Sequence, residues 1–215
     1  MKIIPREARR ITYSTKIRAL KKLNLSALQK SVLIGSALGD GNLELNWSKT
    51  NYRLRIGGSE KQKDYIFWKY NILKNIVLTE PKYSLPTKSF HFSTISHPEI
   101  SELGKIFYCG KKKVLPDKIS ELIKNRTAIA VWFMDDGNVI RRNGKIYGYH
   151  FNTQSFSKEE NAMLVKMLEN IYGIESMIEN NHDYYRIRIM RKHSREILKQ
   201  IIGNIIIPSM QYKIS

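Results

Sequence analysis

The chain alternates between apolar stretches with a helical period and short segments in which apolar and polar residues alternate. Residues 26–39 repeat apolar side chains at helical intervals behind a capping serine, Ser26. After Gly41 the period changes to two, so residues 43–45 and 52–56 are predicted to be strands. The pattern therefore predicts a helix followed by a β-hairpin.

The residues that follow complete a unit of seven elements. A second helix is expected over residues 59–76, and strands over 83–85 and 90–95. A third helix is expected to open at His97, because the proline that follows suits an early helical position. The order of this unit is therefore α-β-β-α-β-β-α.

The same order recurs after a basic connector. The second series is a helix at 127–135, strands near 138–142 and 147–153, a helix from the capping box at Ser157 to Tyr172, strands near 175–180 and 184–190, and a helix from His193 to Ile202. The predicted divisions are a basic N-terminal arm or targeting segment at 1–25, a first half at 26–109, a connector at 110–126 that includes a short helix, and a second half at 127–215. The predicted fold class is α+β, with two halves that pack as one pseudo-symmetric domain.

Each half begins with a copy of one motif. Residues 31–43 and 127–139 are both apolar stretches of helical length that end in Asp-Gly-Asn. The two aligned acids, Asp40 and Asp136, are 96 positions apart (136 − 40), close to half of the chain of 215 residues. Two halves that each supply one carboxylate are what a symmetric, metal-dependent site on a two-stranded substrate requires.

The two copies differ in their small residues. Gly35 and Gly39 are four positions apart, so they share one helix face and allow a partner helix to approach closely. The second copy has Val131 and Asp135 at the corresponding positions. We therefore expect the two motif helices to pack in a less than symmetric way.

The amino-acid composition indicates the kind of partner and the cellular compartment. The net charge is +18, with 37 Lys and Arg against 19 Asp and Glu, which favours a polyanionic partner such as nucleic acid. A single cysteine, Cys109, excludes an internal disulfide and suggests a reducing compartment. The sequence has no secretory signal, and no apolar run approaches the roughly 20 residues that cross a bilayer, so no membrane partner is expected.

The position of the acids predicts their chemistry. A helix end concentrates partial negative charge on its unpaired carbonyls, so a carboxylate beside the carbonyl of Gly39 or Asp135 favours a hard divalent cation. Mg²⁺ suits such a site because it takes few protein carboxylates, and Mn²⁺ is also plausible. Asp136 is preferred to Asp135 as the ligand, because Gly-Asn follows Asp40 and Asp136 alike.

The motifs carry a family resemblance. Residues 33–41 resemble the nine-residue signature of the LAGLIDADG homing endonucleases, and residues 129–137 resemble its second copy. Over about 28–213 the chain is similar to the single-chain, two-motif branch encoded in mobile introns, including residues 152–156 and 207–213. The resemblance implies a monomer whose two antiparallel sheets form a DNA-binding saddle, with the motif helices packed at its centre. It also implies cleavage of one phosphodiester in each strand of a long, asymmetric duplex site, in an organelle such as a mitochondrion or chloroplast.

The resemblance also implies residue roles. Asp40 and Asp136 would be metal ligands that each act on one strand, and Lys113 and Lys213 would lie beside the scissile phosphates. Lys111 and Lys112 are rivals of Lys113 for that position. An ammonium group near the reacting phosphate would offset the negative charge of the transition state.

The strands predict a basic sheet face. Arg53 and Arg55 share one face of a strand whose Leu54 and Ile56 point to the core. Arginine reads guanine in the major groove, and asparagine or glutamine reads adenine. The predicted DNA-contacting residues are Arg53, Arg55, Asn152, Gln154, Arg186, Arg188 and Arg191.

The sequence also allows functions other than cleavage of DNA. A maturase that assists splicing of intron RNA, or a DNA-binding regulator that does not cleave, would use the same fold. Residues 133–136 resemble the paired aspartates of reverse transcriptases, but that motif needs a strand–turn–strand setting and residues 127–133 are predicted to be helical. Retention of both acids and both lysines favours the nuclease.

Overall fold

The computed structural model describes residues 14–203, 205 and 207–215. Most of the predicted N-terminal arm, residues 1–13, therefore lies outside the described residues. The described part of that arm forms a short helix, α2 (Thr15–Leu20), which Ser14 caps and which buries Ile17 in the core.

The first half has the predicted order of elements. They are α3 (Ala27–Leu38), β1 (Asn42–Leu45), β2 (Tyr52–Ser59), α4 (Lys63–Leu73), β3 (Lys82–Ser84), β4 (Ser89–Ser93) and α5 (Pro98–Phe107). Ser26 closes a capping box with Gln29 at the start of α3, and the ring of His97 accepts a hydrogen bond from the Glu99 amide at the start of α5. The helix expected over 59–76 is interrupted, because single 3₁₀ turns, η1 (Glu60–Gln62) and η2 (Lys74–Ile76), precede and follow α4.

The second half repeats this order after the connector. At the end of the first half, β5 (Tyr108–Cys109) pairs with β6 (Lys112–Lys113) of the connector, which also holds α6 (Ile119–Leu122). The second half holds α7 (Arg126–Asp136), β7 (Gly137–Arg142), β8 (Lys145–Phe151), α8 (Lys158–Tyr172), β9 (Met177–Asn181), β10 (Tyr184–Ile189) and α9 (Lys192–Gly203), followed by a 3₁₀ helix, η3 (Pro208–Lys213). Ser157 caps α8 through the predicted capping box with Glu160, and Gly173 ends it in the left-handed conformation.

Each half contributes one antiparallel four-stranded sheet. The strand order is β1-β2-β4-β3 in the first sheet and β7-β8-β10-β9 in the second sheet. Within β2 the buried positions alternate with exposed ones, so Leu54 and Ile56 enter the core while Arg53 and Arg55 face solvent, as the period of two predicts. In β10, Ile187 is likewise buried. Helices cover the apolar faces, which leaves the opposite face of each sheet for a partner.

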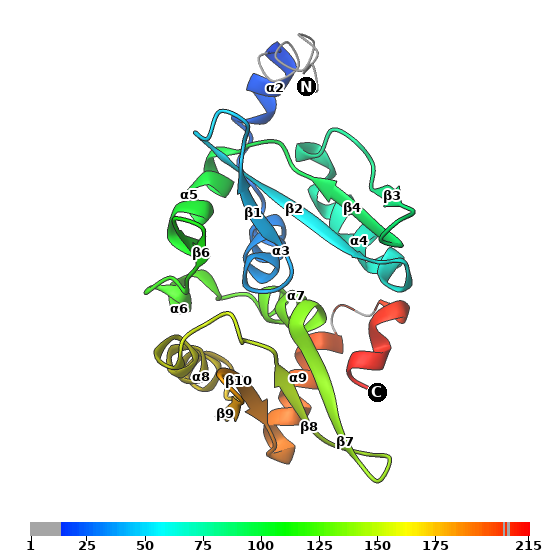
Figure 1. Ribbon diagram of the computed structural model, residues 1–215, viewed down its shortest axis with the longest axis vertical. Helices are drawn as coiled ribbons and strands as arrows, with labels where there is room; N and C mark the ends of the chain where they lie inside the picture. The colour runs from blue at the N-terminus through cyan, green and yellow to red at the C-terminus, as the bar shows by residue number, and fades with distance from the viewer. Residues whose placement is uncertain (1–13, 204, 206) are drawn as a thin grey trace.

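Helices α3 and α7 pack side by side at the centre of the molecule, between the two sheets (Figure 1). Their asymmetry is what allows the close approach. A Cβ added at Gly35 would lie 2.7 Å from the Cβ of Val131, and one added at Gly39 would lie 2.4 Å from the Cβ of Asp135. The glycines of the first motif thus leave the space that the larger residues of the second motif fill.

The described residues include no helix with the length and apolar content needed to cross a bilayer. The order of the elements and the two four-stranded sheets form the predicted α+β pseudo-twofold repeat, with the motif helices at its centre and a sheet on each side.

Candidate active site and nucleic-acid interface

The two motif aspartates meet at the end of the central helix pair. Gly39 caps α3 and Asp40 follows it, while Asp136 is the last residue of α7. The carboxyl groups of Asp40 and Asp136 lie within hydrogen-bonding reach of each other. Because the two helices end side by side, acids that are 96 positions apart in the chain share one site (136 − 40).

The electrostatics of this site disfavour two free carboxylates. Burial, followed by the charges of Asp40 and Asp135, raises the pKa of Asp136 to about 7. Burial and the charge of Asp135 also raise the pKa of Asp40 above its usual range. The site therefore holds excess negative charge, which a proton or a bound cation relieves.

Two lysines reach the same site from distant segments. Lys113 Nζ donates hydrogen bonds to the carbonyls of Leu38 at 3.0 Å and Gly39 at 2.8 Å. Lys213 Nζ donates to the carbonyl of Asp135 at 2.6 Å. Burial lowers the pKa of both lysines, and the aspartates of the site oppose that shift. Each lysine thus contacts a carbonyl that precedes one of the two acids.

The neighbours of Lys113 lie elsewhere. Lys111 and Lys112 are exposed, whereas Lys113 is partly buried and bonded to α3 and its cap. Of the three connector lysines, Lys113 is therefore the one that the structure brings to Asp40.

Asp135 points away from the two acids and into the core. Its carboxylate accepts hydrogen bonds from Lys69 Nζ, at 2.7 Å to Oδ1 and 2.9 Å to Oδ2, and from the Tyr65 hydroxyl at 2.8 Å. The Tyr65 hydroxyl also lies 3.1 Å from the Val131 carbonyl oxygen. The side chain of Asp135 is therefore engaged with α4, and Asp136 is the residue of the pair that faces Asp40.

The donor set fits a hard divalent cation. Asp40 and Asp136 supply carboxylates, and the carbonyls of Gly39 and Asp135 keep a second lone pair beyond the one that each lysine occupies. Within the described ranges, no cluster of three or more His, Cys, Asp or Glu side chains is suited to hold a metal. A metal bound here would therefore have few protein ligands, a property of Mg²⁺ sites that complete their shell with water and phosphate oxygens.

The first sheet presents the predicted arginines to solvent. Arg53 is paired with Glu44 directly across the ladder, with both Nε and Nη2 at 2.9 Å from Oε1. Arg55 lies on the same face and is exposed. Both arginines are therefore accessible to a polyanion.

The second sheet holds its arginines more tightly. Arg186 and Arg188 both donate to Glu179, through Nε at 2.6 Å and Nη1 at 2.9 Å. Arg191 forms an ion pair with Glu175 at 2.6 Å and remains largely exposed. All three predicted residues are thus on the surface, and each is engaged with an acid.

Asn152 and Gln154 lie just beyond the end of β8. The Asn152 side chain donates to the Asp136 carbonyl at 2.7 Å and to Asn138 Oδ1 at 3.0 Å. Asn152 therefore fixes the backbone at the acid site. Gln154 is partly exposed in the loop that follows.

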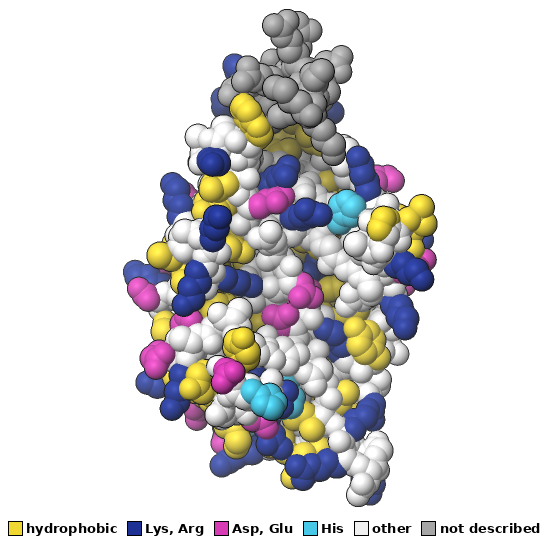
Figure 2. All heavy atoms as spheres, viewed as in Figure 1, with side chains coloured by type: hydrophobic (Ala, Val, Ile, Leu, Met, Phe, Trp, Pro, Cys, Tyr) yellow, Lys and Arg dark blue, Asp and Glu magenta, His cyan; other side chains and the backbone are white. Residues whose placement is uncertain are grey.

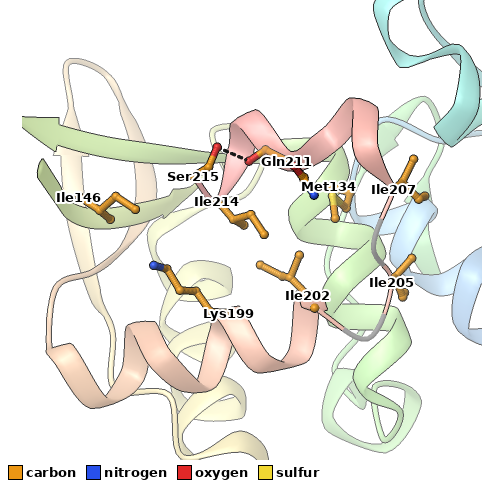
Figure 3. Close-up of a pocket in the computed structure, with 10 residues that line it drawn as sticks. Met134, Ile146, Lys199, Ile202, Ile205, Ile207, Gln211, Ile214 and Ser215 are labelled. Carbon is orange, nitrogen blue, oxygen red and sulfur yellow. Dashed lines mark hydrogen bonds between the residues drawn. The ribbon is translucent and has the colours of Figure 1, made fainter. Parts of the chain in front are cut away.

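An apolar cavity of about 370 Å³ lies away from the acids, between α9 and η3 (Figure 3). It is lined by Met134 of α7, Ile202 of α9 and Ile214, the residue after η3. The Ser215 hydroxyl donates a hydrogen bond to the Gln211 carbonyl at its rim. No acidic side chain lines it. Its lining supports the packing of η3, which carries Lys213, and offers no group for hydrolysis.

Two features of the site escape sequence reasoning. Lys69 is 2% exposed in the middle of a predicted helix, and Glu179 bridges two arginines on a predicted strand. A lysine that falls on the apolar face of α4, between Ile66 and Leu73, is the one signal in the sequence that points to a buried partner.

Paired acids at the ends of two packed helices, flanked by two sheets with basic faces, define a nuclease fold. The family model for the LAGLIDADG DNA endonuclease family matches residues 30–197, so the chain belongs to this family.

The chain is similar to DNA endonuclease I-ChuI of Chlamydomonas applanata, with 25% identity over 214 residues that cover 90% of this chain and 97% of that protein. It is 29% identical to the cytochrome b mRNA maturase bI2 of Debaryomyces hansenii, over 85% of this chain and 72% of the maturase. The structure of the homing endonuclease I-WcaI bound to its DNA recognition sequence superposes with a TM-score of 0.82 and 25% identity, over 94% of this chain and 93% of that one. Two RecA proteins of the genus Mycolicibacterium also match, and the chain spans 31% and 51% of their lengths, so that likeness concerns only part of those proteins.

Proposed function

We propose that this protein is a homing endonuclease that binds a long, asymmetric duplex site and hydrolyses one phosphodiester in each strand with a divalent metal, Mg²⁺ or Mn²⁺. The observation that carries the proposal is the meeting of Asp40 and Asp136 at the ends of α3 and α7. Relatives in the same family include a DNA endonuclease and a homing endonuclease bound to its recognition sequence.

Asp40 and Asp136 are the proposed metal ligands, with the carbonyls of Gly39 and Asp135 beside them. A metal bound there would lower the pKa of an attacking water and stabilise the leaving oxygen. The raised pKa values of both acids support this assignment, because a bound cation would offset the burial and the neighbouring negative charges that raise them.

Lys113 and Lys213 would act on the phosphate. Each holds the backbone carbonyl that precedes an acid, and each keeps at least one further N–H donor to offer to a phosphate oxygen. An ammonium group fixed in this way stabilises the charge that develops on the phosphate without having to reorganise.

The sheets would supply recognition. The five arginines are exposed or partly exposed on the two halves: Arg53, Arg55, Arg186, Arg188 and Arg191. Asn152 contacts the backbone of Asp136, and Gln154 is partly exposed in the loop that follows β8. Lys and Arg side chains spread over the face in view instead of gathering in one patch (Figure 2). A dispersed positive charge suits a long duplex, and binding should weaken steeply with salt.

We further propose that the protein acts as a monomer in the organelle that houses its intron. One chain supplies both acids, so no second copy is needed to cut two strands. The similarity to a cytochrome b mRNA maturase favours a mitochondrial setting.

The test is incubation with a randomised duplex library and Mg²⁺, followed by sequencing of cleaved ends. We expect wild type to release one family of sites, and Asp40→Asn and Asp136→Asn to lose cleavage while they still bind the selected site. Asp117→Asn, which changes an exposed acid of the connector, is the matched control and should cut normally. Undiminished cleavage by both site variants would contradict the assignment.

A second candidate function is assistance to intron RNA splicing, which the similarity to the maturase favours. Splicing help requires binding and no carboxylate chemistry, so Asp40→Asn and Asp136→Asn should retain it. A splicing assay with these variants separates the two functions.

A further inference from the structure

The face of the second sheet that carries the predicted DNA-contacting arginines also carries an acid, Glu179. Glu179 on β9 lies directly opposite Arg186 on β10, and Arg188 is two positions further along the same face. The side chain of Glu179 is 23% exposed. A carboxylate on this face repels phosphate, so its presence requires a compensating role.

Glu179 holds two guanidinium groups at once. Its Oε2 accepts from Arg186 Nε at 2.6 Å, and its Oε1 accepts from Arg188 Nη1 at 2.9 Å. His150 Nε2 lies 2.9 Å from the same Oε2. Burial raises the pKa of Glu179, but the hydrogen bond from Arg186 and the surrounding positive charges outweigh that shift, so the pKa lies below its usual range. The acid is therefore a charged clamp at neutral pH.

The clamp leaves the two arginines with different free donors. Arg188 Nε is directed to Met190 Sδ at 3.0 Å, so its bonds to protein use both Nε and Nη1. Arg186 uses only Nε, and among the described residues its two Nη groups have no protein acceptor. That pair of groups is the fork that reads O6 and N7 of guanine in the major groove.

The first sheet offers a contrast. Glu44 engages one arginine, Arg53, through a single oxygen, and Arg55 beside it has no acid partner among the described residues. Orientation by a shared acid is thus a property of the second sheet. A side chain already fixed in its bound rotamer loses less conformational entropy when it meets a base.

We propose that Glu179 is a specificity-determining positioning residue, which orients Arg186 to read a guanine in the half-site covered by the second sheet. The inference rests on the proposed DNA-binding function. Glu179 itself makes no base contact in this proposal and acts through Arg186.

The experiment measures binding to the selected target and to each of its single base-pair variants at fixed salt, in the uncleaving Asp136→Asn background. Glu179→Gln is compared with Glu44→Gln, the matched change on the first sheet, and with Arg186→Gln. We expect Glu179→Gln to lower the preference for guanine at one position of the second half-site by about tenfold or more. Binding to an unrelated duplex should be unchanged or tighter, because a negative charge has been removed. Glu44→Gln should leave that position unaffected.

A double-variant cycle makes the mechanism explicit. Once Arg186→Gln is present, Glu179→Gln should cause no further loss at the same position. Equal tightening of binding to all duplexes by Glu179→Gln, with discrimination intact, would overturn the proposal in favour of simple charge repulsion. A carboxylate can itself accept a hydrogen bond from N4 of cytosine. If Glu179→Gln still reduces a preference for cytosine once Arg186→Gln is present, Glu179 contacts the base directly and the proposal is overturned.

Thermal unfolding and circular dichroism verify that each variant is folded. If the parent protein binds no duplex with preference, the proposed function itself fails and takes this inference with it. If the parent discriminates and Glu179→Gln discriminates equally well, only this inference fails.

Discussion

Lys69 Nζ lies 2.7 Å from Oδ1 of Asp135 in the protein core, where the two side chains are both 2% exposed. The two residues belong to different halves, so this ion pair joins α4 of the first half to α7 of the second. Asp135 immediately precedes the candidate metal ligand Asp136, and its Cβ packs against Gly39. The buried ion pair thus fixes Asp135, and with it the backbone next to Asp136 and Gly39.

The ion pair between Lys69 and Asp135 should contribute strongly to the stability of the fold. Lys69→Met leaves the Asp135 carboxylate buried with the Tyr65 hydroxyl as its remaining side-chain donor, and we expect the free energy of unfolding to fall by about 3–5 kcal/mol. Denaturant unfolding measures the change. The double variant Lys69→Met/Asp135→Asn should lose less, because no unpaired charge remains, and an equal or larger loss in the double variant would contradict this account.

The motif glycines should resist replacement by alanine. An added Cβ at Gly35 would lie 2.5 Å from the Ala128 carbonyl, which cannot rotate away. We expect Gly35→Ala, although alanine is the better helix former, and Gly39→Ala at the helix cap each to lower the free energy of unfolding by about 1–3 kcal/mol. Gly203→Ala at the end of α9 is the control, since a Cβ there meets no described atom within 4 Å. Thermal unfolding measures the difference. If Gly203→Ala unfolds at a lower temperature than Gly35→Ala and Gly39→Ala, the close packing of α3 against α7 is contradicted.

The acid site should make stability depend on pH. Burial and neighbouring carboxylates raise the pKa of Asp136 from its usual 3.8 to about 7 in the folded protein. Protonation of this group therefore stabilises the folded state below about pH 4, and the contribution is lost as the pH rises through 7. In metal-free buffer, wild type should lose on the order of 1–3 kcal/mol relative to Asp136→Asn between pH 4 and 8, after allowance for solvent screening. Thermal unfolding of both proteins over this range tests the sign, and a constant difference between them would argue against it.

The two lysines should affect rate more than affinity. We expect Lys113→Met and Lys213→Met each to slow single-turnover cleavage by about 10²-fold or more, with little change in Kd for the target. Lys112→Met removes an exposed neighbour and should keep the rate while weakening the salt dependence of binding by about one unit of slope. A loss of rate in Lys112→Met as large as in Lys113→Met would show that general charge, and no specific position, explains the effect.

Local patterns made much of the fold predictable. The capping serine Ser26 and the capping box at Ser157 marked the starts of α3 and α8, and the alternation around Leu54 marked the exposed face of β2. These features depend on residues a few positions apart. Repetition of the motif then paired the two halves and set Asp40 opposite Asp136.

Contacts between distant segments were not predictable in the same way. Lys69 and Asp135 are 66 positions apart, and Asn152 reaches the Asp136 carbonyl because β8 pairs antiparallel with β7, the strand that follows α7. Glu179 reads as an ordinary exposed strand residue until the register places it across from Arg186. Each of these partners depends on how the elements pack, which no local period encodes.

The unequal helix seam has a consequence for how the chain can be divided. A pair of two first halves would place glycine opposite glycine at the helix contact and would bury two copies of Lys69 without an acid partner. A pair of two second halves would place Val131 opposite Val131 and Asp135 opposite Asp135, where the side chains would collide. Fragments that end in the connector should consequently reassemble as a mixed pair and reject self-pairing. The two halves therefore behave like the two different subunits of a heterodimer joined in one chain. Because the halves are not identical, a substitution on one sheet does not also change the other sheet.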